Sequence, residues 1–155
     1  MYKVYPNAVI PKRENVSIGD HSVIEDFVLI YSSKVEIGKY VEIGTGTKIV
    51  GKGELYISDF VTIAPSCVII TSTPNLHKEL MVSSMIPDNM RDPIIGKTFI
   101  RNHAFIGAGS IILPNVEIQR KCVVGANSTV LSNSVLESNS VYVGSPVKKV
   151  GVRFR

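Results

Sequence analysis

The chain of 155 residues has the length of one ordinary domain, and a hydrophobic fraction of 45% is enough for a buried core. Its two cysteines, Cys67 and Cys122, have no paired spacing, which excludes a disulfide framework and a metal-binding knuckle. The net charge of +4 is mild and scattered except near the C-terminus, so it suggests an anionic small molecule at least as readily as nucleic acid. We expect a small-molecule partner and no nucleic acid.

The chain begins with MYKVYP, which lacks the long apolar segment of a secretion signal. Later apolar runs are only a few residues long, too short to span a membrane. We therefore expect a cytoplasmic protein without a membrane span, in which residues 1–155 form a single domain.

From Ile18 onward an aliphatic residue recurs every six positions. The column contains Ile18, Ile24, Ile30, Ile37, Ile43, Ile49, Ile57, Ile63 and Ile69, then Ile100, Ile106, Ile112, Ile118, Val124, Val130, Leu136 and Tyr142. It slips by one residue before Ile37 and by two before Ile57, and a loop insertion at about 71–99 interrupts it. Neither an amphipathic helix nor a free-standing alternating strand has a period of six. The repeat predicts short strands separated by corners, with the aliphatic side chains of successive coils stacked on the axis.

The position three residues after each aliphatic predicts a tight corner. The residues that indicate such a corner are His21, Tyr40, Gly46, His103, Gly109, Asn115, Asn127, Asn133 and Asn139. Glycine, asparagine and histidine are among the residues that most often accept a positive φ, so we interpret His21 and His103 as corner residues without a catalytic role. Cys67 and Cys122 fall in the next column, which holds small or β-branched side chains, and we interpret them as core fillers.

Between Thr71 and Phe99 the six-residue period is absent. The segment carries three prolines and three of the four methionines, so it is too apolar for a disordered linker and is expected to pack against something. Long irregular insertions in compact domains are usually functional or disordered. His77 lies in this insertion, outside the corner column.

The motifs IGDHSV, IGKYVE, IGAGSI and VGANST resemble the hexapeptide-repeat acyltransferase superfamily over nearly the whole chain. The resemblance implies an all-β fold, a single-stranded left-handed parallel β-helix of hexapeptide repeats with an inserted loop. Three hexads make one coil of a triangular prism. The hand comes from the resemblance, because the general rule for parallel strands is right-handed. Family members form homotrimers with active sites between subunits, and we expect a homotrimer here.

The downstream segments MIPDN, FIRNHAFIGAGSIILPNV and VGSPVKKV resemble sugar and polysaccharide O-acetyltransferases. This resemblance implies direct transfer of an acetyl group from acetyl-CoA to a hydroxyl of a sugar or polysaccharide precursor, in a ternary complex and without a metal. It gives His77 the role of general base, and histidine titrates in the range that such a base needs. It makes the backbone NH of Ala108 the donor that stabilises the oxyanion.

The family pattern also places coenzyme A along one edge of the prism, where small residues allow its pantetheine arm to approach the backbone. The small residues at this edge are Gly107, Ala108, Gly125 and Ala126. The basic residues of the C-terminal segment, which the family pattern assigns to the nucleotide phosphates, are Lys148, Lys149, Arg153 and Arg155.

Three alternatives stay open. An N-acetyltransferase of an amino-sugar nucleotide would need similar machinery to that of an O-acetyltransferase. A gamma-class carbonic anhydrase shares the prism but binds zinc through three histidines, and two of the three histidines here are explained as corners. A non-catalytic β-helix scaffold predicts no binding of acetyl-CoA and no defect when His77 is changed.

Overall fold

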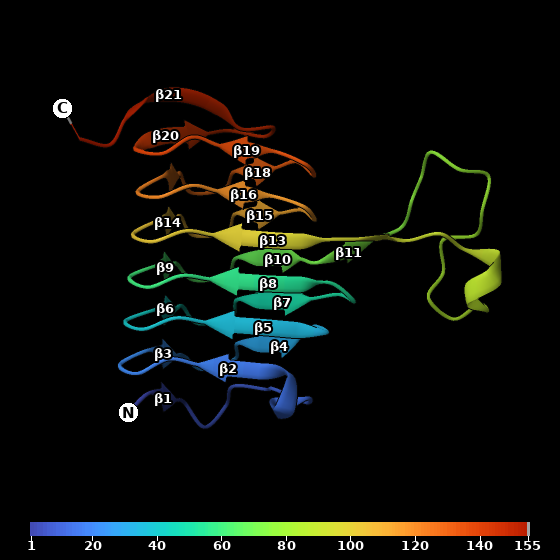
Figure 1. Cartoon of the computed structure of the whole chain (residues 1–155), viewed down its shortest axis with the longest axis horizontal. Helices are drawn as coiled ribbons and strands as arrows, with labels where there is room; N and C mark the ends of the chain where they lie inside the picture. The colour runs from blue at the N-terminus through green and yellow to red at the C-terminus, as the bar shows by residue number, and fades with distance from the viewer. Residues whose placement is uncertain (155) are drawn as a thin grey trace.

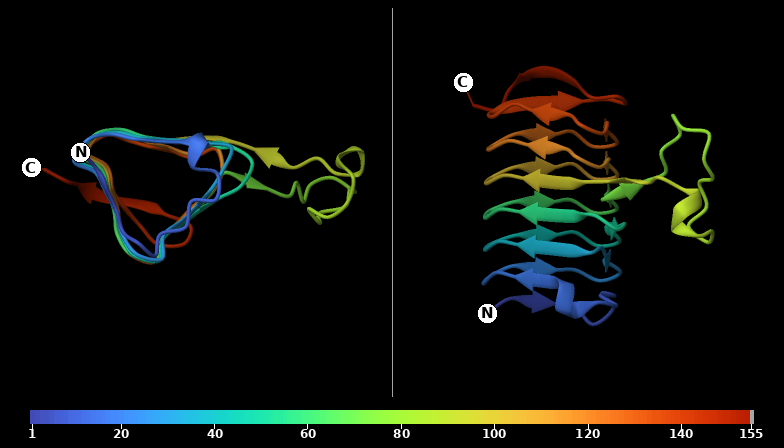
Figure 2. Two further views of the ribbon diagram at one scale, coloured as in Figure 1. Left: turned by 90° about the horizontal axis from the view of Figure 1, so that it is seen from below. Right: turned by 45° about the vertical axis from the view of Figure 1, so that its right-hand side comes forward.

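The six-residue period winds the chain into a triangular column whose three faces are parallel β-sheets (Figure 1). In the computed structural model, which describes residues 1–154, each complete coil contributes one short strand to each face. Viewed along the column, the coils superimpose as a triangle (Figure 2). As the chain rises in Figure 1, the strands at the front run to the left and those at the back to the right, so the coil is left-handed, as predicted.

The three faces, called A, B and C, alternate along the chain. Face A contains β1 (Lys3–Val4), β3 (Val23–Ile24), β6 (Glu42–Ile43), β9 (Thr62–Ile63), β14 (Phe105–Ile106), β17 (Val123–Val124), β20 (Ser140–Val143) and β21 (Lys148–Val152). Face B contains β4 (Leu29–Tyr31), β7 (Lys48–Val50), β10 (Val68–Ile70), β15 (Ile111–Ile112) and β18 (Thr129–Val130). Face C contains β2 (Val16–Ile18), β5 (Lys34–Ile37), β8 (Glu54–Ile57), β13 (Lys97–Ile100), β16 (Glu117–Ile118) and β19 (Val135–Leu136). Only β21, which pairs antiparallel with β20, departs from parallel pairing on these faces.

The predicted aliphatic column forms the core. Its members pair in register from coil to coil, as Ile37 with Ile57 and Ile57 with Ile100 on face C. Every member except the half-buried Ile18 is buried. Burying an aliphatic side chain of this size stabilises the fold by about 1.5–3 kcal/mol. Because no single coil encloses its own aliphatic residues, the stability of each coil depends on its neighbours.

The three edges of the prism are named after the faces that they join: corner CA, corner AB and corner BC. Every predicted corner residue has a positive φ, for example 63° at His21, 60° at His103 and 53° at Asn127. His21 and His103 lie on corner CA, at the two ends of a ring stack with Tyr40 and Phe60 between them. The ring centroids are 4.8 Å apart from His21 to Tyr40, 5.2 Å from Tyr40 to Phe60 and 4.9 Å from Phe60 to His103. Their assignment as corner residues is confirmed, and the ring stack ties four coils together.

The register slips and the insertion all fall at corner BC. The slips correspond to the turns Tyr31–Lys34 and Val50–Glu54, and the 3-10 helix η1 (Arg13–Asn15) occupies the same corner of the first coil. The insertion leaves on an antiparallel pair, β11 (Ser72–Thr73) and β12 (Ile94–Ile95), and contains the 3-10 helix η2 (Asp88–Met90). The regular coil resumes at Lys97, so the irregular part is shorter than the predicted range of about 71–99. Residues 1–154 include no helix with the length and hydrophobicity of a transmembrane segment.

Both cysteine side chains are fully buried in the core. Burial raises the pKa of the Cys67 thiol, and it raises the pKa of Cys122 to about 12. The thiolate is the nucleophilic form, so neither side chain reacts readily while the protein is folded. We expect Ellman's reagent to label neither cysteine in the native protein and both after denaturation; rapid labelling of the native protein would contradict this burial.

Thr98 on β13 has a buried hydroxyl without a hydrogen-bond partner among the described residues. Thr98→Val replaces this group with a methyl group of similar shape, and we expect it to raise the free energy of unfolding by about 1 kcal/mol in urea denaturation. The matched control is Thr71→Val, because the equally buried Thr71 hydroxyl lies 2.8 Å from Ser32 Oγ and bonds to it. That variant should lose about 1–3 kcal/mol, and equal losses in both variants would contradict the assignment.

Candidate functional site

Corner AB brings together the four small residues that the sequence assigned to the cofactor. The Gly107 amide donates to Val124 O and the Asn127 amide to Ala108 O, so these turns lie directly above one another. A Cβ at Gly107 would lie 2.4 Å from the backbone N of Ala126, so only glycine allows the two coils to approach this closely. The side chains of Ala108 and Ala126 are exposed. The corner is therefore a strip of accessible backbone without bulky side chains.

Of the predicted basic residues, Lys148 lies nearest to this strip. It pairs in register with Val143, whose side chain is the nearest neighbour of Gly125. Lys149 forms an ion pair with Glu137, 2.5 Å from Nζ to Oε2, and the bond raises the pKa of Lys149. Because Glu137 begins a turn of corner CA, Lys149 is directed away from corner AB.

The remaining C-terminal residues also lie away from corner AB. Arg153 donates a hydrogen bond to the carbonyl of His103, which places it at corner CA. Arg155 lies outside the described residues. Among the members of this basic set that the structure describes, only Lys148 is thus placed at the end of the predicted cofactor strip.

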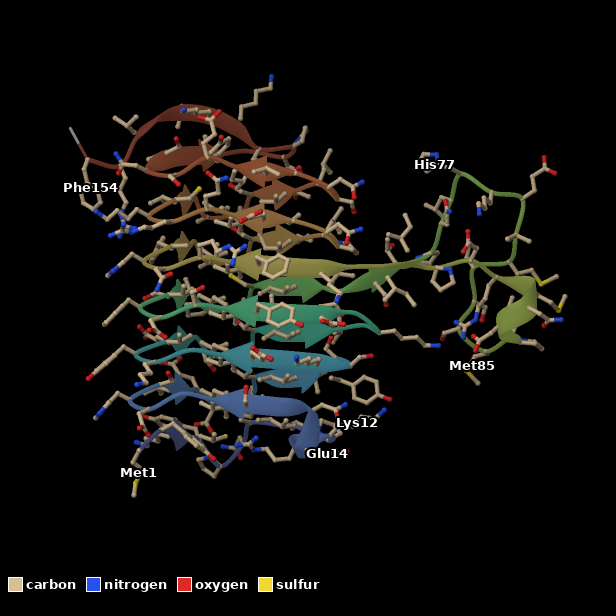
Figure 3. All side chains as sticks on the ribbon, viewed as in Figure 1. Met1, Lys12, Glu14, His77, Met85 and Phe154 are labelled. Carbon is tan, nitrogen blue, oxygen red and sulfur yellow. The ribbon has the colours of Figure 1, made fainter. Side chains whose placement is uncertain are left out.

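His77 lies at the top of the insertion in Figure 3, clear of the prism. The residue is exposed, and its backbone N–H donates to Asn75 Oδ1 at 3.2 Å. The insertion leaves from corner BC, whereas Ala108 lies at corner AB, on the other edge of face B. Within one chain, the structure does not bring His77 and Ala108 together.

Corner BC contains a feature that the sequence did not predict. A cavity of about 420 Å³ lies between the insertion and the successive turns of this corner. The prism lines it with Lys12, Tyr31 and Lys52, and the insertion with Arg91 and Asp92. The sequence did contain one signal for this cavity. Both register slips and the insertion follow the third hexad of a coil, so they fall at the same corner.

The cavity is lined by three basic side chains and one carboxylate. Arg91 is paired with Asp88, and this guanidinium holds the pKa of Asp88 below its usual range. Lys52 Nζ lies 3.9 Å from Asp88 Oδ1 and links the prism to the insertion. The ion pair with Lys78 lowers the pKa of Asp92 in the same way, so both carboxylates stay ionised near neutral pH.

The three histidines do not form a common ligand set. His21 and His103 lie at opposite ends of the ring stack on corner CA, and His77 lies on the insertion. Within residues 1–154, no three histidine, cysteine, aspartate or glutamate side chains are grouped to hold a metal ion. A zinc site needs such a group of ligands.

Residues 97–132 match the family model described as bacterial transferase hexapeptide (six repeats). The dTDP-4-amino-4,6-dideoxy-D-glucose acyltransferase of Escherichia coli is 32% identical over 142 residues, covering 90% of this chain and 73% of the relative. The galactoside O-acetyltransferase of Lactococcus lactis is 28% identical over 115 residues, and this match covers 70% of this chain and 51% of that enzyme.

Among solved structures, the chain is similar to AntD, an N-acyltransferase from Bacillus cereus. The complex of AntD with dTDP and 3-hydroxybutyryl-CoA has a TM-score of 0.91 and 31% identity, over 98% of this chain and 80% of that chain. A further structure of AntD contains dTDP-4-amino-4,6-dideoxyglucose and coenzyme A, with a TM-score of 0.91 and 32% identity, over 98% of this chain and 81% of that chain. The similarity thus extends over all of the coils and not over the repeat motif alone.

Proposed function

Since this chain belongs to the bacterial hexapeptide-repeat transferase family, we propose that it transfers an acyl group from acyl-CoA to the amino group of a nucleotide-linked amino sugar. The observation that carries the proposal is the match to AntD, an N-acyltransferase with dTDP and acyl-CoA bound, over 98% of the chain. A sugar hydroxyl, which the motifs alone favoured, is the second candidate, and the similarity to galactoside O-acetyltransferase supports it. Either product would serve the synthesis of a polysaccharide or glycoconjugate in the cytoplasm.

In this proposal coenzyme A lies along corner AB. The pantetheine arm fits a strip where Gly107 and Gly125 leave the backbone accessible and where the side chains of Ala108 and Ala126 are short. Amide groups on this strip can hydrogen-bond the arm without reorganisation. Lys148, at the C-terminal end of the strip, is the residue that we assign to a phosphate of the nucleotide.

The chemistry needs a base and an oxyanion donor. The acceptor nitrogen attacks the thioester carbonyl, a C–N bond forms, and the C–S bond breaks as the coenzyme A thiolate leaves. We assign the removal of the acceptor proton to the imidazole of His77, and a placed base contributes about 10²–10⁴ in rate. The backbone NH of Ala108 is the donor that we assign to the developing oxyanion. No acyl-enzyme forms, so the buried cysteines take no part.

A second copy of the chain is needed to complete this site, because His77 and Ala108 lie at different edges of one prism. The insertion also exposes large apolar side chains, which favours packing against another copy. They are Leu76, Leu80, Met81, Val82, Met85 and Met90. We propose a homotrimer in which the insertion of one subunit reaches corner AB of the next. Its mass in solution should be three times the 16.9 kDa of the chain.

The reaction is tested by incubating the protein with acetyl-CoA or 3-hydroxybutyryl-CoA and a panel of acceptors, while Ellman's reagent follows thiol release. Amino-sugar nucleotides are expected to give thiol release and an N-acylated product that resists hydroxylamine. Turnover with hydroxyl acceptors alone, giving a product that hydroxylamine cleaves, would favour the second candidate. No thiol release with any acceptor and no binding of coenzyme A would support the scaffold instead.

A further inference from the structure

The cavity at corner BC has a positive charge excess, although Asp88, which is outside its lining, pairs with Arg91 and Lys52. Arg91, Lys52 and Lys12 line it, against Asp92 alone among the acidic side chains. Asp92 is already neutralised by Lys78, which bonds to its carboxylate. The field inside the cavity is therefore positive and favours an anionic ligand.

Arg91 is the most informative of these residues. Its side chain is only 10% exposed, whereas its partner Asp88 is 83% exposed. The Nε–H of Arg91 is buried and has no acceptor among the described residues. A charged donor buried without an acceptor is destabilising, so an anion seated against this guanidinium would supply what the protein does not. The donors of a guanidinium group form a planar fork, so arginine can bind a phosphate through two hydrogen bonds at once.

The prism supplies two further cations across the cavity. Lys52 extends from the Gly51–Gly53 turn toward η2, and Lys12 projects from the first coil on the side where the insertion leaves (Figure 3). Lys12 Nζ lies 5.4 Å from the centre of the Tyr31 ring, which also lines the cavity. Cations that converge from two separate segments, beside an aromatic ring, suit a ligand that carries both phosphates and a flat base.

We infer that this cavity binds the diphosphate of the nucleotide-linked acceptor, through Arg91, Lys52 and Lys12. The inference rests on the proposed function for the identity of the ligand, and on the cavity alone for its phosphate chemistry. Coenzyme A also carries phosphates, but the strip assigned to it lies at corner AB, on the other edge of face B. The site therefore separates the two phosphate-bearing substrates on each subunit.

Calorimetric titration without acyl-CoA tests the site directly. dTDP, UDP and GDP are titrated into the full-length protein, with thymidine and coenzyme A as comparison ligands. We expect at least one nucleoside diphosphate to bind, and Arg91→Gln to weaken it about 10- to 100-fold, since charge-assisted hydrogen bonds are lost. Lys12→Gln, on the prism, should weaken the binding of the same nucleoside diphosphate to a smaller extent. Binding of thymidine and of coenzyme A should not change in either variant.

Asp88→Asn is the matched control for a purely structural role of Arg91, in which the ion pair with Asp88 only stabilises the fold of the insertion. This variant breaks the same ion pair but keeps the guanidinium, so it should bind the nucleoside diphosphate at least as tightly as the wild type. Equal losses in Asp88→Asn and Arg91→Gln would overturn the inference. Weakened binding of coenzyme A, unchanged binding of the diphosphate, or no binding of any of the three diphosphates would also overturn it.

The same variants separate this inference from the proposed reaction. If the protein transfers acyl groups but Arg91→Gln binds the diphosphate as the wild type does, the proposed subsite is wrong and the proposed function stands. If Arg91→Gln weakens diphosphate binding but the protein transfers no acyl group, the proposed subsite stands and the proposed function is wrong.

Discussion

Replacing His77 with alanine should lower kcat for acyl transfer by about 10²–10⁴-fold, the contribution of a well-placed general base. The affinity for coenzyme A should not change, because we assign its binding to the backbone strip and Lys148 of corner AB and not to the His77 imidazole. Since the residue is exposed, the free energy of unfolding should also stay the same. Thiol release at saturating acyl-CoA and acceptor measures kcat, and calorimetry measures the affinity.

The control for this variant is His103→Asn. His103 has a φ of 60° on corner CA, and asparagine accepts that conformation. The His103→Asn variant loses only the last ring of the stack on corner CA, so activity should remain at the wild-type level at temperatures where the protein is folded. Full activity of His77→Ala would remove His77 from the mechanism while leaving the enzyme class untouched.

Replacing Ala126 with glutamate should weaken the binding of coenzyme A by about 100-fold or more, through steric overlap and the repulsion of its phosphates. The Ala126 side chain points into solvent from corner AB, so the fold should tolerate the larger side chain. Titration with coenzyme A gives the affinity, and thermal unfolding reports on the fold. The KM for acyl-CoA should rise to the same extent.

The equivalent exposed position on corner CA is Ser138. Ser138→Glu adds the same charge and bulk to another edge of the same region, and it should bind coenzyme A as the wild type does. If the two glutamate variants lose affinity equally, or if Ala126→Glu loses none, coenzyme A does not lie along corner AB.

The period of six was sufficient to predict the coil, the core and the corners. Each aliphatic residue at that spacing meets its equivalent in the next coil, so a local pattern determines a long-range contact, as between Ile57 and Ile100. The corner residues were predictable for a similar reason, because a positive φ is a property of a single residue and its type. The left hand could not be derived in this way and came from family resemblance, since the usual rule for parallel strands is the opposite.

The cavity at corner BC was not predictable, because its residues come from segments with no shared period. Lys12, Lys52 and Arg91 are each unremarkable basic residues in the sequence, and only the fold of the insertion brings them to one space. The separation of His77 from Ala108 was equally hidden. The family resemblance assigned a role to both residues, but which edge of the prism each occupies depends on how the coils and the insertion are placed in three dimensions.

The shared active site is tested most directly by complementation between two inactive variants. His77→Ala retains corner AB, and Ala126→Glu retains the insertion, so a mixed trimer contains sites with both parts intact. With random assembly of equal amounts after co-expression, about a quarter of the sites should be intact and the activity about a quarter of that of the wild type. Activity no higher than the average of the two variants alone would contradict the account, because it would mean that each chain supplies its own base to its own cofactor.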